Sequence, residues 1–359
     1  MFLSTAHIGT ASRDIDTPAV LIDIGLMERN IERAHQYLAA HNVFNRPHVK
    51  THKIPAIAHR QMAAGAIGIA CQKLSEAEVM ADAGFPDIQV TFNIVGRQKL
   101  DRLIALSRRA RITVTADDMV LVRALSEAAR GSEVTIPVLV ECDTGQHRCG
   151  VATPERAVEL AQGIAALPGV QFLGLMTYPT SRVASEFVSA AARMLRSVGL
   201  RAEVISGGGT PSLWQLHEIG GFTEHRAGEY IFNDRTIIAA GTAAVEDCAL
   251  RVIATVVSRP APSRAVIDAG TKTLTAHPGL GVTGYGYVVE YPEATIDRLT
   301  EEHGILDVGK SGRKPEIGET LTIIPNRASV VVNLHDVVYG IRNGRVETVW
   351  PVLARGAVR

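Results

Sequence analysis

The sequence predicts a (β/α)8 barrel followed by a mainly antiparallel β domain. Between Pro18 and about residue 220, short apolar segments alternate strictly with amphipathic helical segments, and this alternation predicts a parallel sheet. Eight such units within about 200 residues fit a closed barrel. A doubly wound open sheet is the alternative that the same alternation allows. After residue 240 most segments between the expected strands lose helical periodicity, which is typical of an antiparallel sheet.

Short runs rich in β-branched and other apolar residues predict the strands of the barrel. In chain order they are AVLIDI (19–24), RPHVK (46–50), GIACQK (68–73), DIQVTF (87–92), RITVTA (111–116), IPVLVECD (136–143), FLGLMTY (172–178) and EVISGG (203–208). Helices are expected between them, for example in LMERNIERAHQYLAAH, SEAEVMADAG and DDMVLVRALSEAAR.

The C-terminal part shows strands punctuated by Gly, Pro and Asn. The expected strands are CALRVIATVVSRP (248–260), RAVIDAG (264–270), GYGYVVEY (284–291), ETLTIIP (319–325), SVVVNLHD (329–336) and VETVWPV (346–352). We therefore predict a barrel domain at residues 16–242 and a β domain at residues 243–359, which residues 1–15 join.

Composition excludes several classes of function. The chain has 37 Lys+Arg and 37 Asp+Glu residues, so no net basic charge attracts nucleic acid or an anionic membrane. No signal peptide and no run of eighteen apolar residues is present. The four cysteines have neither metal-type nor disulfide-framework spacing. We expect a cytoplasmic protein with reduced thiols, whose partners are small molecules or a second copy of itself.

Polar residues follow five of the expected strands. They are Lys50, Gln72, Arg148, Tyr178 and the segment 207–210, GGGT. Because the active site of a (β/α)8 barrel lies at the carboxyl ends of its strands, we expect all of them on one rim.

The segment RPHVKTHK (46–53) carries His48, Lys50 and His52 at a spacing of two. On a strand these three side chains would point to the same face. Histidines beside a lysine can lower its pKa or move protons, and a neutral lysine amine is a nucleophile. A solvated edge strand is the plainer interpretation of the same residues.

The segment SGGGTPS (206–212) precedes an expected short helix that begins near Pro211. Glycines let backbone N–H groups approach an anion, and phosphate sites after strands 7 and 8 recur in this barrel. A tight turn would use the same glycines. A rim lysine together with a phosphate site suggests pyridoxal 5'-phosphate, bound to Lys50 as a Schiff base.

Nearly the whole chain resembles the D-threonine aldolase / D-serine dehydratase family of fold-type III pyridoxal-phosphate enzymes, which are relatives of alanine racemase. The matching segments are TPAVLID, RPHVKTHK, CQKLSEAEVMADAG, CDTGQHRCG, SGGGTP, GEYIFND, EEHG and VNLHD. The resemblance implies an alanine racemase-like fold, a homodimer, and a cofactor carried by Lys50.

The resemblance also implies roles for other residues. DTGQHRCG is similar to a racemase motif whose arginine bonds the pyridine nitrogen, so Arg148 is expected to face the ring and to keep that nitrogen unprotonated. Tyr178 and Tyr230 resemble active-site and phosphate-contacting tyrosines, although both could instead be packing residues. The remaining candidates for cofactor binding are Gln72, Gly208, Gly209 and Thr210.

One motif departs from the family. Its members usually carry Pro-Asn-His-x-Cys or Pro-Asn-His-x-Asp, whose side chains hold a divalent metal. This sequence reads PNRAS, with Arg327 at the histidine position and Ser329 at the last position. A guanidinium is not a metal ligand and a lone serine is a poor one, so we expect the usual metal to be absent. His335 and Asp336 are expected on opposite faces of a strand, and a relocated site stays open. Arg327 could replace the metal's charge, or the metal could have been lost together with the chemistry.

Three functions follow from these residues. The first is a pyridoxal-phosphate-dependent lyase on a β-hydroxy-D-amino acid, with aldol cleavage favoured over dehydration, because hydroxide leaves poorly without a metal. Its catalytic candidates are Lys50, His48, His52 and Arg327. The alternative is a metal-independent amino-acid racemase or epimerase. A non-catalytic cofactor carrier is the third reading, but such proteins lack a second domain.

Overall fold

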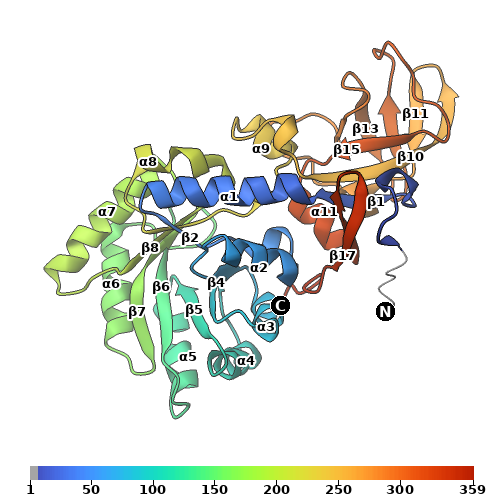
Figure 1. Cartoon of the computed structure of the whole chain (residues 1–359). Coiled ribbons are helices and arrows are strands. Elements are labelled where there is room, and N and C mark those ends of the chain that lie inside the picture. The colour runs from blue at the N-terminus through green and yellow to red at the C-terminus, as the bar shows by residue number, and fades with distance from the viewer. Residues whose placement is uncertain (1–6) are drawn as a thin grey trace. The chain divides into compact units, whose positions relative to one another are not determined.

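The computed structural model describes residues 7–359, which form two compact units (Figure 1). The first unit contains residues 7–33, 51–56 and 229–356, and the second contains residues 34–50, 57–228 and 357–359. Residues 16–33, 51–56 and 229–242, which the sequence assigns to the barrel domain, fall in the first unit. Of the segment 1–15 that was expected to join the β domain, residues 1–6 lie outside the described part. None of the described helices is long and apolar enough to cross a bilayer.

The second unit is built on eight parallel strands. Their order is β2(Phe44–Asn45), β9(Glu224–Arg226), β8(Val204–Gly208), β7(Val170–Thr177), β6(Ile136–Cys142), β5(Arg111–Ala116), β4(Asp87–Asn93) and β3(Ile69–Cys71). The chain after β2 also pairs with β3, because Ala70 N–H donates to Pro47 O at 2.9 Å and His48 forms a parallel bridge with Ala70. This bridge closes the sheet into a barrel.

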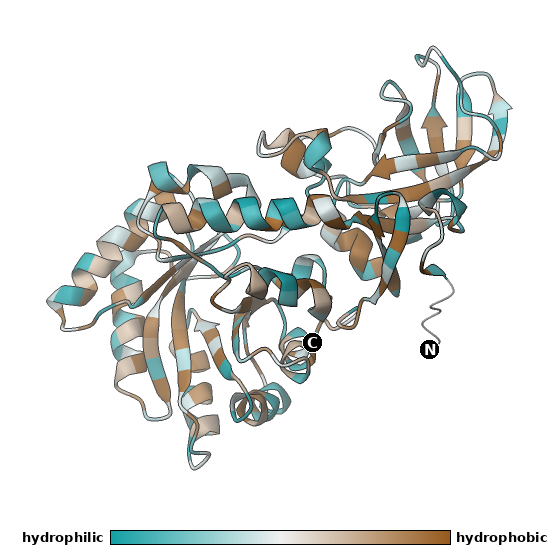
Figure 2. Cartoon of the chain, in the orientation of Figure 1, coloured by the Kyte–Doolittle hydropathy of each residue, from teal (hydrophilic) through white to brown (hydrophobic). Residues whose placement is uncertain are grey.

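Helices alternate with these strands along the chain and cover the barrel (Figure 1). They are α1(Ile24–Ala40), α2(Pro55–Ala63), α3(Leu74–Asp82), α4(Arg97–Ser107), α5(Met119–Ala129), α6(Pro154–Ala165), α7(Arg182–Ser197), the 3-10 helix η4(Thr210–Gln215) and α8(Leu216–Ile219). Figure 2 shows apolar residues along the barrel strands and mixed colours along helices such as α1, as expected for helices with one face toward the strands.

The first unit contains a nine-stranded, mainly antiparallel sheet. Its main order is β13(Thr295–Leu299), β14(Gly304–Asp307), β11(Arg264–Ile267), β10(Leu250–Ala261), β1(Ala19–Asp23), β16(Val337–Arg342) and β17(Arg345–Pro351); β15(Thr320–Ile324) pairs with β10 and with β12(Tyr287–Val288). The short helices of this unit are η2(Ser12–Asp14), η5(Glu229–Ile231), α9(Arg235–Ala239), η6(Val245–Asp247), α10(Thr271–Leu274) and α11(Ala328–Leu334). The predicted fold class, a barrel plus an antiparallel domain, is confirmed.

Two barrel strands differ from the prediction. The segment expected as the first barrel strand, β1, pairs with β10 and β16 in the sheet of the first unit. The eighth barrel strand is instead β9, which the sequence analysis missed. All three of its residues are polar and buried, so it shows no apolar run.

Two segments predicted as strands adopt other structures. Extended pairing after β2 stops at His48, whose N–H donates to Ala227 O at 2.9 Å, and Val49–Thr51 form the 3-10 turn η3. Lys50 therefore lies on a turn, and the predicted two-residue alternation of His48, Lys50 and His52 is wrong. Most of the predicted strand 329–336 is helix α11, so His335 and Asp336 follow a helix and do not lie on a strand.

Candidate active site

Lys50 lies on the turn at the carboxyl end of β2 and is half-buried. Its Nζ donates to Gln72 Oε1 at 3.3 Å. Gln72 follows β3 and is fixed twice, because its Nε2 donates to Thr91 O at 3.1 Å and its backbone N–H donates to Glu76 Oε2 at 2.7 Å. The predicted pair of rim residues is thus brought together, and Gln72 orients the amine.

The two histidines beside Lys50 occupy different environments. His48 is buried, its Nε2 lies 3.0 Å from Thr91 Oγ1, and its Nδ1 accepts weakly from Lys50 N–H at 3.4 Å. It therefore contacts the same threonine that supports Gln72. His52 belongs to the first unit, where it is fully buried, accepts from Ile54 N–H and forms an edge contact with Phe232. These contacts make His52 part of a packed core.

The glycines that end β8 form a cradle with Thr210. Gly208 N–H donates to Thr180 Oγ1 at 2.8 Å, and Gly209 has φ +115°, a conformation that other residues rarely adopt. Thr210 is buried, and its Oγ1 has no hydrogen-bond partner among the described residues. A buried hydroxyl without a partner is costly in an isolated protein, and it is suited to an anionic ligand.

A buried histidine supports this cradle from behind. His225 of β9 lies 3.0 Å from Gly209 O through Nε2 and 3.5 Å from Thr180 Oγ1 through Nδ1. Because a carbonyl only accepts, Nε2 carries the proton and Nδ1 accepts from Thr180. Burial lowers the pKa of His225 to about 4, so the ring is neutral near pH 7. The sequence analysis missed this residue.

A second missed residue, Arg226, lies under Gly208. Its Nε donates to Ser206 Oγ at 2.7 Å and its Nη2 to Thr177 O at 2.8 Å. Its Nη1 would lie 3.3 Å from a Cβ atom built on Gly208, so a larger residue there would push the guanidinium aside by a few tenths of an ångström. Burial lowers the pKa of Arg226 to about 10, which still leaves it charged at neutral pH. The cradle therefore contains a buried positive charge.

Arg148 and Tyr178 lie at the open side of the rim. The guanidinium carbon of Arg148 is 5.4 Å from the centre of the Tyr178 ring, and both side chains are exposed. Glu141 of β6, a further residue the sequence analysis missed, interacts electrostatically with both Arg148 and Arg226. Burial, followed by repulsion from Asp117, raises the pKa of its carboxyl, while both arginines lower it. Arg148 and Tyr178 are thus neighbours, as their places after β6 and β7 predict.

The first unit carries Tyr230 and Arg327. Tyr230 is buried in η5. Arg327 precedes α11, and its Nη2 lies 3.5 Å from Glu229 Oε1. Asp234 accepts from Ala328 N–H at 3.0 Å and Ile237 N–H at 3.0 Å. Burial, followed by repulsion from Glu229, raises the pKa of Asp234 to about 7.

The residues of the second unit fit pyridoxal 5'-phosphate. The unpartnered Thr210 hydroxyl and the cradle glycines suit its phosphate, and Lys50 supplies the amine. A lysine and a phosphate cradle on one barrel rim, in a chain whose first unit is a mainly antiparallel sheet, define the class of fold-type III pyridoxal-phosphate enzymes.

Comparisons with known proteins agree with this class. Residues 22–236 match the family model of the alanine racemase N-terminal domain, and residues 249–341 match that of the serine dehydratase domain. D-threonine aldolase of an Arthrobacter species is 37% identical, with 99% of this chain and 96% of that protein covered. For 3-hydroxy-D-aspartate aldolase of Paracoccus denitrificans the identity is 34%, with 97% and 94% covered.

Solved structures show the same relationship. D-threonine aldolase of Filomicrobium marinum superposes with a TM-score of 0.90 at 38% identity, covering 98% of this chain and 99% of its own. An alanine racemase of Clostridium difficile, 12% identical with a TM-score of 0.71, shares the fold alone. The chain belongs to the D-threonine aldolase / D-serine dehydratase family, and it is a lyase of the pyridoxal-phosphate-dependent type.

Proposed function

We propose that this protein cleaves a β-hydroxy-D-amino acid to glycine and an aldehyde, with pyridoxal phosphate bound at Lys50. The observation that carries the proposal is the half-buried Lys50, oriented by Gln72 on the same barrel rim as the Gly208–Thr210 cradle. The names of the relatives support aldol cleavage, since two of them are aldolases of D-threonine and of 3-hydroxy-D-aspartate.

The cofactor would supply an electron sink for the pair released at Cα when the Cα–Cβ bond breaks. The chain's own residues do the rest. Gln72 holds the Lys50 amine in one orientation, and Thr91 fixes both Gln72 and His48. Lys50, once free of the cofactor, is positioned as the base or acid at Cα. His48, whose Nδ1 accepts from the Lys50 backbone N–H, is the candidate for passing protons to this lysine.

Two arginines are candidates for the pyridine nitrogen. Arg148 is the one that the racemase-like motif indicates. Arg226 is the second candidate, because it is buried and its Nη1 lies against the Gly208 backbone, while its Nε donates to Ser206 and its Nη2 to Thr177. Either guanidinium stays protonated and would keep the ring nitrogen unprotonated. Separate Arg148→Lys and Arg226→Lys variants distinguish the two, because only the true partner shifts the absorbance of the bound cofactor.

Product analysis tests the function. The protein, loaded with pyridoxal phosphate, is incubated with D-threonine, D-serine or D-3-hydroxyaspartate, and glycine, keto acids and deuterium uptake at Cα are measured. We expect glycine with the matching aldehyde. A keto acid without glycine would assign a dehydratase, and exchange with inversion alone would assign the racemase alternative.

Two lysine variants test whether Lys50 is the residue that binds the cofactor. Borohydride trapping is expected to leave a pyridoxyl group on the peptide that contains Lys50. Lys50→Ala should lose the trapped group and all turnover, whereas Lys310→Ala, at an exposed lysine of the first unit, should retain both.

A further inference from the structure

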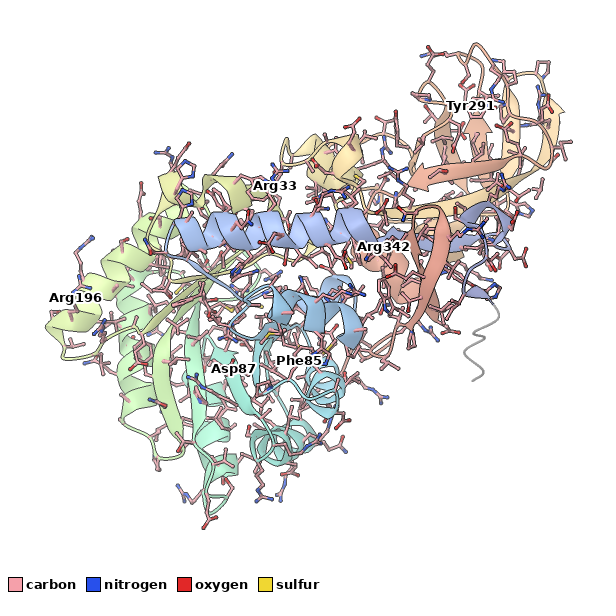
Figure 3. The ribbon with its side chains drawn as sticks, viewed as in Figure 1. Arg33, Phe85, Asp87, Arg196, Tyr291 and Arg342 are labelled. Atoms are coloured by element: carbon pink, nitrogen blue, oxygen red, sulfur yellow. The ribbon has the colours of Figure 1, made fainter. Side chains whose placement is uncertain are left out.

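The barrel interior contains a buried ion pair near the amino ends of its strands. The interior of a (β/α)8 barrel is usually filled by branched apolar side chains. Here Arg46, which follows β2, and Glu224, the first residue of β9, are both buried. Arg46 Nε donates to Glu224 Oε2 at 2.9 Å, and Arg46 Nη1 donates to Asp87, which is labelled in Figure 3. A buried pair of charges needs polar surroundings, because removing charge from water is costly.

A small cavity lies beside this ion pair. Arg46, Gln89, Thr113 and Glu224 contribute polar groups to its lining, and Leu139 and Leu173 contribute apolar wall. All of these residues belong to the second unit, so the cavity lies within one compact body. The space open to the centres of water-sized molecules is about 30 Å³. One water needs roughly 10–15 Å³ of such space, so the cavity has room for about two.

Gln89 is the residue of this lining that lacks protein partners. It is 1% exposed, and neither its Oε1 nor its Nε2 has a hydrogen-bond partner among residues 7–359. A buried amide without partners destabilises a fold, and nearly all such groups in proteins are bonded to protein or to ordered water. Because both ends of the amide lack a partner, the conclusion does not depend on which end carries the oxygen.

The chemistry of the lining selects one kind of occupant. Gln89 Nε2 needs an acceptor and Gln89 Oε1 needs a donor, and a water molecule supplies both. An anion only accepts hydrogen bonds and would face the carboxylate of Glu224, whereas a cation would face the guanidinium groups of Arg46 and Arg111. We propose that this cavity is a binding site for ordered water, with about two molecules held by Gln89, Thr113 and the Arg46–Glu224 pair.

The water site lies at the foot of a chain of hydrogen bonds that leads through the barrel to the rim. Glu224 Oε1 accepts from Ser206 Oγ at 2.6 Å, and Ser206 Oγ accepts from Arg226 Nε at 2.7 Å. Arg226 lies against Gly208 of the cradle. The waters therefore solvate the carboxylate from which this chain starts. The inference is separate from the proposed function, because the site would bind water whichever reaction the rim catalyses.

A crystal structure of the protein loaded with pyridoxal phosphate is the direct test. Crystals grown in sodium bromide distinguish water from an anion, because only bromide gives an anomalous signal at the bromine edge. We expect density for ordered water within hydrogen-bond distance of Gln89 Oε1 and Nε2, without an anomalous peak. A lack of density beside Gln89, or a bromide peak in the cavity, would overturn the inference.

The Gln89→Met variant tests the same site in solution. Methionine is about as long as glutamine but cannot bond to water, so this variant should lower the melting temperature of the apoprotein by roughly 2–4 °C. Gln171→Met, at an exposed glutamine of β7 in the same unit, is the matched control and should melt like the wild type. An unchanged or raised melting temperature of Gln89→Met would show that the amide is buried without water, and the inference would be wrong.

A double-mutant cycle tests whether Gln89 and Thr113 share the water. Thr113→Val keeps the shape of the side chain and removes its hydroxyl group. If one water bonds to both side chains, the double variant Q89M/T113V should lose less stability than the sum of the two single losses, because the first substitution already displaces the water. Additive losses in the melting temperature would contradict a shared water and overturn the inference.

Discussion

Lys50 Nζ and Gln72 Oε1 are joined by a hydrogen bond of 3.3 Å, although the two residues follow different strands of the barrel. The bond joins the candidate cofactor lysine to a side chain that is itself held by Thr91 and Glu76. The amine is thus oriented through the adjacent strands β3 and β4 and the first turn of α3.

Gln72→Ala should slow the reaction without unfolding the protein. Losing one acceptor of about 1–1.5 kcal/mol predicts a roughly tenfold lower kcat/KM. Steady-state kinetics with D-threonine measure the change, and Gln171→Ala, at an exposed glutamine of β7, is the control. Equal kinetics for the two variants would show that Gln72 does not position Lys50.

The Thr210→Val variant is expected to change the affinity for the cofactor without lowering the stability of the apoprotein. Valine keeps the shape of threonine and removes the unpartnered hydroxyl, so the apoprotein should be as stable as the wild type or slightly more stable. With phosphate bound, loss of a hydrogen bond to a charged group, about 1.5–3 kcal/mol, should raise the Kd of pyridoxal phosphate roughly 10- to 100-fold. Fluorescence titration measures the Kd. An unchanged value would place the phosphate away from Thr210.

The lowered pKa of the buried His225 predicts how the stability of the folded protein depends on pH. Its pKa is lowered to about 4 in the folded protein, so the unfolded chain binds more protons between pH 4 and about 6.5. Stability is therefore lost as the pH falls through this window, by about 2 kcal/mol at pH 5. Urea unfolding of the apoprotein at pH 7 and pH 5 measures the loss, which His225→Gln should reduce. An equal loss in both proteins would assign it to other groups.

Arg46 and Arg111 share Asp87 as an ion-pair partner, yet we expect them to contribute very different free energies to the stability of the fold. Arg46 is buried and donates to Glu224 at 2.9 Å and to Asp87 at 2.5 Å, whereas the exposed Arg111 reaches Asp87 at 3.4 Å. The Asp87 side chain that the two arginines share is labelled in Figure 3. Arg46→Met removes the ion-pair partner of the buried Glu224 carboxyl, which should cost about 3–5 kcal/mol. Arg111→Ala should cost less than about 1 kcal/mol. Chemical denaturation compares the two, and similar losses would contradict this assignment.

Much of the fold could be predicted, because the barrel strands β3, β4, β5, β6 and β7 contain apolar residues that lie in the interior. The exceptions have physical reasons. Glu224, His225 and Arg226 form β9 through buried ion pairs and hydrogen bonds, for which no sequence period exists. The valines of α11 favour a strand by propensity, yet Asp234 accepts the N–H at the start of this segment and helix forms.

The candidate site was predictable where residues follow strands. Lys50, Gln72, Arg148, Tyr178 and the cradle are brought to one rim by the barrel itself. Glu141 and Thr180 were not found, because a single carboxylate or hydroxyl gives no pattern until the chain folds. His52 is an error of the other kind, a residue predicted to be catalytic that the structure places in a core. Its position in the sequence beside Lys50 suggested a catalytic role, but its ring is packed against Phe232.

The pairing of β1 with β10 and β16 has a consequence for synthesis on the ribosome. Residues 19–23 emerge early, but their partners at 250–253 and 339–341 emerge only near the end of translation. Every strand of the barrel lies between these two points and is complete by residue 226. The barrel can therefore form on the nascent chain, while β1 stays unpaired until its partner strands have been synthesised. A chain that ends before residue 337 would contain a complete barrel and an incomplete first unit. In such truncated products the unpaired strand β1 is the segment that chaperones and proteases would bind.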